Sequence, residues 1–360
     1  MISPTSTQDD GPPSQQDALE FELTSGLEVG RKLKIKPLLK GGRYQIIDVL
    51  ADGGMGVVYR ARDLRVGGNI VLIKAVKYDT AMFGLSREKA LYHIYAMRQR
   101  FKREKNTLLE MSSRGLNNVP CLNDFFTDDN PDLQHTFPFG ELKNAETLQI
   151  GKQTLTLHIN KEPFIVMERI FGASLQNIIS DISERRLLEI ARAICRTLEQ
   201  IHKIRERPRR KPLSFMFMDL KPDNILVDNQ GGVVLIDFGA AIPVIGGSRK
   251  GKGAFTPGFA PPEIRRFAHP AAIVDHRVDL YSLGAILFQG LSNKNINPII
   301  LASELDDEYP ILDPGSLRSD ITTSTRALTL KALSRQPEGR FDDAEKMRRA
   351  IEVALRGVST

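Results

Sequence analysis

Residues 217–239 read FMDLKPDNILVDNQGGVVLIDFG, and this stretch decides the fold. Two short apolar runs, residues 225–227 and 233–236, flank an Asx- and glycine-rich turn, a pattern that predicts a β-hairpin. Because a hairpin brings its two ends together, we expect Asn224 and Asp237 to meet at one end of it. An amide oxygen beside a carboxylate is a hard-oxygen ligand set that suits Mg²⁺.

Asp219 and Lys221 lie just before the hairpin, on a loop. The spacing D-x-K-x-x-N followed by D-F-G resembles the catalytic and metal-binding loops of protein kinases. The resemblance implies that Asp219 accepts or orients the proton of the substrate hydroxyl and that Lys221 neutralises charge on the transferring phosphoryl group. It assigns Asn224 and Asp237 to Mg²⁺, with Mn²⁺ as the alternative ion. The plainer interpretation is that acidic loop residues are only solvated, which this spacing around a hairpin disfavours.

The composition is that of a globular protein, with 360 residues, 41% hydrophobic and 26% charged, enough for a two-lobed core. The net charge of +6 is not concentrated in one long run, so we expect no nucleic-acid partner. Cys121 and Cys195 are too few for a disulfide framework, which favours a reducing compartment. No apolar run approaches the ~18 residues of a membrane span, and no signal peptide is evident. We therefore expect a cytoplasmic protein.

The resemblance implies an α+β, two-lobed protein-kinase-like fold. Its smaller lobe, about residues 40–168, should be an antiparallel sheet with one helix, and its larger lobe, about residues 172–355, should be mostly helical. Residues 1–35 are rich in Ser, Thr, Gln, Asp, Gly and Pro and are predicted to form a disordered tail. The predicted kinase domain covers residues 36–358.

A glycine-rich stretch joins two strand-like runs, residues 44–50 and 57–61. Glycines allow backbone N–H groups to approach phosphate oxygens closely. The strand-to-strand setting argues against a dinucleotide-binding fold. The stretch resembles the family's G-x-G-x-x-G-x-V, although Ala51 stands where the first glycine is usual. The resemblance assigns to the nucleotide site Gly53, Gly54, Gly56 and Val58.

The strand-like residues 70–76 contain Lys74, and a lysine inside an apolar strand needs a partner for its charge. The sequence V-L-I-K resembles the family's V-A-I-K, which implies that Lys74 binds the α- and β-phosphates of ATP, with Lys77 as the alternative. Leu72 replaces an alanine that lies against adenine in the family, and this larger side chain narrows the pocket.

Residues 86–112 are predicted to form a long, basic helix. The partner of Lys74 should be a glutamate on this helix, and the candidates are Glu88 and Glu104. We favour Glu104 because an apolar stripe surrounds it and because its distance to the next strand fits. This choice implies an insertion near residues 78–98, which forms an extra helix or a docking surface.

Residues 119–126 are predicted to form a strand, and a second insertion follows at residues 128–162. The alternating stretch at residues 154–159 predicts a β-hairpin within it. Residues 164–168 resume the lobe as a central strand. The resemblance puts Met167 at the back of the adenine pocket and the adenine-binding hinge at the residues after it. The cofactor-binding set is completed by Glu168, Ile170 and Leu226.

In the second lobe, periodicity predicts helices at residues 174–180 and 185–202. His202 closes the second helix and is interpreted as structural. Residues 205–211 (RERPRRK) are interpreted as a solvated basic loop rather than a nucleic-acid site.

The stretch Thr256–Glu263 (TPGFAPPE) resembles the end of the family's activation segment, where peptide docks. The resemblance implies that Thr256 contacts the catalytic loop and that Glu263 pairs with Arg340. Asp279 resembles the helix aspartate that accepts hydrogen bonds from the backbone of that loop.

Two residues of the catalytic loop depart from the family's H-R-D. Phe217 replaces the histidine and should still pack against Phe238 of D-F-G. Met218 replaces an arginine that binds an activation-loop phosphate, and methionine cannot do this. We therefore hypothesise that activity does not depend on a phosphate docked beside Asp219.

The leading hypothesis is a soluble, bacterial-like member of the eukaryotic-like (Hanks-type) serine/threonine kinase family, which uses MgATP on protein substrates, with its own chain as a candidate substrate for autophosphorylation. Lys221 favours Ser or Thr over Tyr as the acceptor. One alternative is a pseudokinase scaffold, which Ala51, Leu72 and Met218 favour and which would bind nucleotide without transfer. The other is a small-molecule kinase, which would generally lack the peptide-docking stretch Thr256–Glu263.

Overall fold

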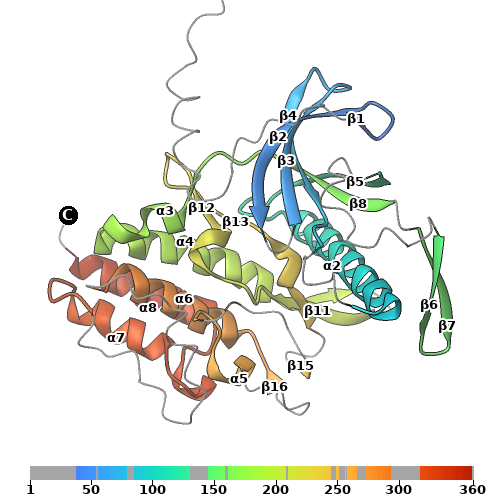
Figure 1. The fold of residues 1–360 in the computed structure, drawn as a ribbon. Coiled ribbons are helices and arrows are strands. Elements are labelled where there is room, and N and C mark those ends of the chain that lie inside the picture. Colours follow the sequence, from blue (N-terminus) through green and yellow to red (C-terminus); the bar gives the residue numbers. More distant parts are fainter. Residues whose placement is uncertain are drawn as a thin grey trace, which may run out of the picture.

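The protein consists of a β-rich lobe above a helical lobe (Figure 1). The computed structural model describes residues 38–53, 56–78, 85–129, 145–158, 161–207, 210–244, 249–250, 256, 258–265, 273–292 and 317–358. The predicted two-lobed α+β architecture is confirmed. The predicted tail, residues 1–35, lies outside the described residues.

The smaller lobe is built on a six-stranded antiparallel sheet in the order β1-β2-β3-β4-β8-β5. The strands are β1 (Leu38–Leu39), β2 (Tyr44–Gly53), β3 (Gly56–Asp63), β4 (Asn69–Ala75), β5 (Leu122–Asp128) and β8 (Glu162–Glu168). Alternate side chains bury one face, with Tyr44, Tyr59 and Ile73 in its core. The strand predicted at residues 119–126 begins later, at Leu122, because Pro120 has no N–H to donate to a ladder.

One long helix, α2 (Arg87–Ser113), packs against the other face of the sheet (Figure 1). It buries Ile94, Phe101, Leu108 and Met111 at helical spacing. The described part of the predicted insertion at residues 78–98 continues this helix and forms no second one. The hairpin predicted in the other insertion is present as β6 (Ala145–Ile150) and β7 (Gln153–His158).

The larger lobe is mostly helical, as predicted. Its helices are α3 (Leu175–Ile178), α4 (Glu184–His202), α5 (Pro262–Arg265), α6 (Arg277–Gly290), α7 (Thr323–Ala332) and α8 (Ala344–Gly357). The predicted apolar face of α4 is buried, and α6 is buried almost all round, so it lies in the centre of the lobe. No helix among the described residues is long and apolar enough to cross a membrane.

Short strands carry the loops of the candidate site. The predicted hairpin forms from β12 (Ile225–Val227) and β13 (Val233–Leu235), and β12 also pairs with β9 (Ala173–Ser174). A second sheet contains β10 (Arg205–Arg207), β11 (Arg210–Met216) and β14 (Ile242–Val244), and a third pairs β15 (Arg249–Lys250) with β16 (Ile273–Val274). The loop predicted at residues 205–211 is therefore wrong. Arg205 pairs with Leu213 and Arg207 with Arg210, and β11 then continues into residues that pair with β14.

Candidate active site

Three charged side chains from separate elements meet between the sheet and the hairpin. Lys74 of β4 donates hydrogen bonds to Glu104 of α2, with Nζ 2.8 Å from Oε1 and 3.0 Å from Oε2. The same Nζ lies 2.8 Å from Oδ1 of Asp237, which follows β13. The structure thus pairs Lys74 with the predicted glutamate, and Glu88 takes no part in this pairing. Binding of the α- and β-phosphates of ATP by Lys74 remains a prediction.

Electrostatics favours the charged forms of Lys74 and Asp237, whereas burial raises the pKa of the Glu104 carboxyl above its usual value. Burial opposes the charge on Lys74, but the carboxylates of Glu104 and Asp237 outweigh it and raise the pKa of the ammonium. Burial likewise opposes the charge on Asp237, but Lys74 lowers the pKa of that carboxyl below its usual value. A fixed cation is therefore available next to an ionised carboxylate.

The backbone at Asp237 is held in a specific conformation. Its φ of 62° lies in the left-handed region, and its side chain accepts a hydrogen bond of 3.1 Å from the N–H of Gly239. Arg100 of α2 donates a 2.9 Å hydrogen bond to the carbonyl of Gly239. The ring of Phe238 lies edge-on to Phe217 with centroids 4.9 Å apart, which confirms the predicted contact. Sequence reasoning missed Arg100 because nothing distinguishes it from the other basic residues of this helix.

The loop before the hairpin gathers polar groups around Asp219. Asn224 donates from Nδ2 to Oδ2 of Asp219 at 3.0 Å and to its carbonyl at 2.8 Å. Lys221 lies 3.3 Å from Oδ2 of Asp219 and donates to the hydroxyl of Thr256 at 3.0 Å. Thr256 in turn donates to Oδ1 of Asp219. The structure therefore brings together the catalytic loop and the end of the segment that follows D-F-G.

Asp279 of α6 supports this loop from below. Its carboxylate accepts hydrogen bonds of 2.8 Å from the backbone N–H groups of Phe217 and Met218, and it lies 2.8 Å from Nε2 of His202. Asp279 is fully buried, so these contacts replace its hydration. The predicted contact with the loop backbone is present, and His202 has a structural contact.

A bidentate ion pair fixes the end of the activation segment. Glu263 of α5 accepts hydrogen bonds from both terminal nitrogens of Arg340, at 2.6 and 2.8 Å. The guanidinium of Arg340 is completely buried and also donates to the backbone carbonyl of Ser334. This is the pairing that the sequence predicted across a separation of 77 residues.

The glycine-rich turn closes the β2–β3 hairpin, where Gly53 lies opposite Gly56. A Cβ on Gly56 would lie 2.5 Å from the carbonyl oxygen of Ala75, so no other residue fits there without movement. Gly54 lies outside the described residues.

The sheet surface next to this turn carries the remaining predicted residues. Val58 lies opposite Lys74 in the strand register and is half-buried. Leu72 shares a face of β4 with Lys74 and lies opposite Met167 of β8. The leucine that replaces the family's alanine therefore lies on the same face as the lysine.

The predicted hinge follows β8. Met167 is buried, Glu168 is exposed and Ile170 is half-buried. Oε1 of Glu168 accepts a 2.9 Å hydrogen bond from the N–H of Cys121, which links the hinge to the start of β5. Leu226 of β12 is half-buried. Adenine binding by these residues remains a prediction.

The residues present fit a divalent metal ion. Asn224 commits its amide nitrogen to Asp219, which leaves its oxygen Oδ1 for a ligand. Lys74 and Gly239 both donate to Oδ1 of Asp237. Oδ2 accepts no hydrogen bond from the described residues and is therefore available to a metal ion. One carboxylate and one amide oxygen are typical of a site that Mg²⁺ completes with phosphate oxygens and water.

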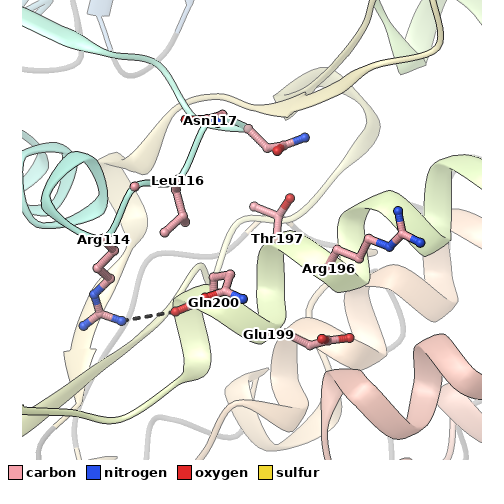
Figure 2. Close-up of a pocket in the computed structure, with 9 residues that line it drawn as sticks. Arg114, Leu116, Asn117, Arg196, Thr197, Glu199 and Gln200 are labelled. Carbon is pink, nitrogen blue, oxygen red and sulfur yellow. Dashed lines mark hydrogen bonds between the residues drawn. The ribbon is translucent and has the colours of Figure 1, made fainter.

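A separate pocket of about 390 Å³ lies between the end of α2 and α4, and none of the predicted site residues lines it (Figure 2). Arg114 reaches across it and donates to the carbonyl of Gln200 at 3.2 Å. Arg114 also donates to the carbonyls of Lys203 and Leu213, which ties the end of α2 to the larger lobe.

The two-lobed fold, the Lys74–Glu104 pair and the Asp219 loop together define the class of protein kinase domains. Residues 44–345 match the protein kinase domain family, and the chain belongs to that family. Relatives include the serine/threonine-protein kinase PknB of Mycolicibacterium smegmatis, 28% identical over 317 residues that cover 85% of this chain and 42% of that protein. The serine/threonine-protein kinase PksC of Streptomyces coelicolor is 27% identical over 325 residues, 86% of this chain and 48% of that protein. The chain spans less than half the length of these relatives.

Proposed function

We propose that this chain is a serine/threonine protein kinase that transfers the γ-phosphoryl group of MgATP to hydroxyl groups of protein substrates, its own included. The observation that carries the proposal is the double engagement of Lys74, whose Nζ lies 2.8 Å from both Glu104 and Asp237. A buried lysine held in this way presents a fixed positive charge beside a carboxylate suited to Mg²⁺.

The residues around Asp219 support an in-line transfer. Asp219 would orient the acceptor hydroxyl and accept its proton, and Lys221 would neutralise charge that develops on the phosphoryl oxygens. Asn224 and Asp237 would hold Mg²⁺, which would supply positive charge to the phosphate groups of ATP. Because Asn224 is hydrogen-bonded to Asp219, the residue that would bind the metal ion and the residue that would orient the acceptor hydroxyl are held together. Most of the rate enhancement then comes from positioning and charge neutralisation.

Two features support a protein hydroxyl as the acceptor. The stretch Thr256–Glu263 resembles a peptide-docking segment, and it is anchored at one end by Lys221 and at the other by Arg340. Lys221 itself favours Ser or Thr, and the relatives named above carry serine/threonine-kinase names. The expected absence of a nucleic-acid partner and the cytoplasmic location remain predictions from composition.

The test is transfer of labelled phosphate from MgATP to the purified chain and to a generic basic protein, with Asp237→Ala in parallel. We expect label on Ser or Thr after hydrolysis with the wild type and none with the variant. If the wild type labels neither itself nor the basic protein, but MgATP raises its melting temperature, the proposal is overturned and the pseudokinase is favoured.

A further inference from the structure

The long helix α2 meets the sheet through a second buried ion pair, whose polarity is opposite to that of Lys74–Glu104. Here the helix supplies the cation, Arg98, and β8 supplies the anion, Glu162. Nη2 of Arg98 lies 2.6 Å from Oε1 of Glu162, and Nε lies 3.2 Å from Oε2. Glu162 is 0% exposed and Arg98 is 9% exposed, so the two charges are stabilised by each other and by protein groups rather than by water.

Further groups complete this buried network. The phenol of Tyr78, which follows β4, donates to Glu162 at 2.9 Å. Burial and the carboxylate of Glu162 hold the pKa of Tyr78 well above its usual value, so the phenol remains a donor. Arg98 also donates from Nη1 to the carbonyl of His158, the last residue of β7, at 2.8 Å. The network therefore joins α2 to β8, to the end of β4 and to the inserted hairpin.

The two ion pairs have matching spacings on the helix and on the sheet, so both can form only when α2 lies at one position along the sheet. Arg98 and Glu104 are both buried residues of α2, six residues apart, a rise of about 9 Å. Lys74 lies opposite Ile165 of β8, three residues from Glu162, or about 10 Å along the strand. A shift of the helix in one direction would bring Arg98 towards Lys74, and a shift in the other direction would bring Glu104 towards Glu162, so either shift brings like charges together. Outward movement would separate both ion pairs and leave Lys74 with Asp237 alone, which is costly.

The inserted hairpin adds a third contact at the beginning of α2, where it lies beside the helix (Figure 1). Leu148 and Leu157 of the hairpin are buried in the same apolar cluster as Leu91 of α2. At the far end of the helix, Arg114 is bound to backbone carbonyls of the larger lobe. The helix is thus held along its whole length.

We propose that Arg98, Glu162 and Tyr78 are positioning residues that hold α2 at the register in which Glu104 meets Lys74. The inference rests on the proposed function, because it gives the network a role in phosphoryl transfer through the Lys74–Glu104 pair. The described residues of the two predicted insertions that join the network then share one role, which is to stabilise this arrangement.

The test compares Arg98→Met with Lys102→Met, which removes the same charge from an exposed position on the same helix. Rates are measured well below the melting temperature of each variant. We expect Arg98→Met to lower kcat/KM for ATP about tenfold or more and Lys102→Met to change it less than about twofold. A lower melting temperature with an unchanged kcat/KM would overturn the proposal.

A double-mutant cycle with Glu104→Gln separates positioning from general stability. Once the Lys74–Glu104 pair is weakened, Arg98→Met should cost much less than it costs in the wild type. An equal cost in both backgrounds would contradict the proposal. If Arg98→Met does not fold, Tyr78→Phe removes only one hydroxyl and takes its place in the same cycle.

The charge-swapped variant Arg98→Glu/Glu162→Arg should recover part of the rate that Arg98→Met loses, and no recovery would count against a role for the ion pair. Failure of the proposed function is seen separately, as a wild type that transfers no phosphate. In that case hydrogen exchange of α2 decides the positioning role without turnover. Faster exchange around Glu104 in Arg98→Met than in Lys102→Met supports it, and equal exchange overturns it.

Discussion

Lys221 donates a 3.0 Å hydrogen bond to the hydroxyl of Thr256, which lies 35 residues further along the chain. The same hydroxyl donates to Asp219, so Thr256 bridges the two residues to which we assign chemistry. This bridge joins the catalytic loop to the segment that resembles a peptide-docking site. Under the proposed function, this bridge couples the position of the acceptor to that of Asp219.

Loss of this bridge should lower activity. Thr256→Val keeps the shape of the side chain but removes hydrogen bonds to charged groups, each worth about 1.5–3 kcal/mol. We expect kcat to fall by about 10- to 100-fold, and Thr256→Ser, which keeps the hydroxyl, to stay near the wild type. Steady-state kinetics with a peptide substrate would measure both. Equal rates for the valine and serine variants would show that the bridge is not used.

Activity should not depend on phosphate bound beside Asp219. Met218 is 5% exposed and lies in an apolar cluster with Ile242 and Val274, a setting that offers no cation to a phosphate. Protein treated with a broad-specificity phosphatase should keep its initial rate to within about twofold of untreated protein. A large loss of rate that returns on rephosphorylation would contradict the expectation.

Removing the charge of Glu263 should destabilise the larger lobe. Glu263→Gln leaves the fully buried guanidinium of Arg340 without its carboxylate, and breaking a buried pair on one side costs about 3–5 kcal/mol. Glu338→Gln is the control, because Glu338 is 74% exposed and 3.6 Å from Arg277. Urea unfolding should give a lower midpoint for the first variant only. Matching midpoints would mean that the neighbouring backbone carbonyls stabilise the buried charge of Arg340 without the carboxylate of Glu263.

The smaller lobe should lose stability in acid through Asp63. Hydrogen bonds from Arg43 lower the pKa of the Asp63 carboxyl below its usual value of 3.8. A depressed native pKa contributes stability that is present above the usual pKa and is lost as the pH falls through the native value. Asp63→Asn should therefore flatten the acid side of the stability profile, whereas Asp320→Asn, at a 73% exposed position, should leave it unchanged. Parallel profiles for wild type and Asp63→Asn would contradict this assignment.

Local patterns predicted most of the elements that position the site. The β12–β13 hairpin, the β6–β7 hairpin and helix α4 each carry a complete periodic signal in a short stretch. Glu104 could be chosen over Glu88 because the apolar stripe of α2 continues on both sides of Glu104. These predictions depend only on neighbours along the chain.

Contacts between distant charges were not predictable in the same way. An arginine in a basic helix is expected to be solvated, and only the partner of Arg98, 64 residues away, explains its burial. Arg100 binds a backbone carbonyl, which leaves no trace in the side-chain pattern. The charge of residues 205–211 predicts a loop, whereas Arg205 pairs with Leu213 and Arg207 with Arg210; only the continuation of β11 pairs with the distant β14.

The most direct test of the account is Asp219→Asn, compared with Asp223→Asn, a matched change at an exposed carboxylate four residues away. Asp219 is assigned to the acceptor hydroxyl and not to the nucleotide, so Asp219→Asn should keep the MgATP-induced shift in melting temperature. Its rate of phosphate transfer should fall by about 10²- to 10⁴-fold, the contribution typical of a positioned base, whereas Asp223→Asn should match the wild type. Transfer by Asp219→Asn at the wild-type rate would contradict the account.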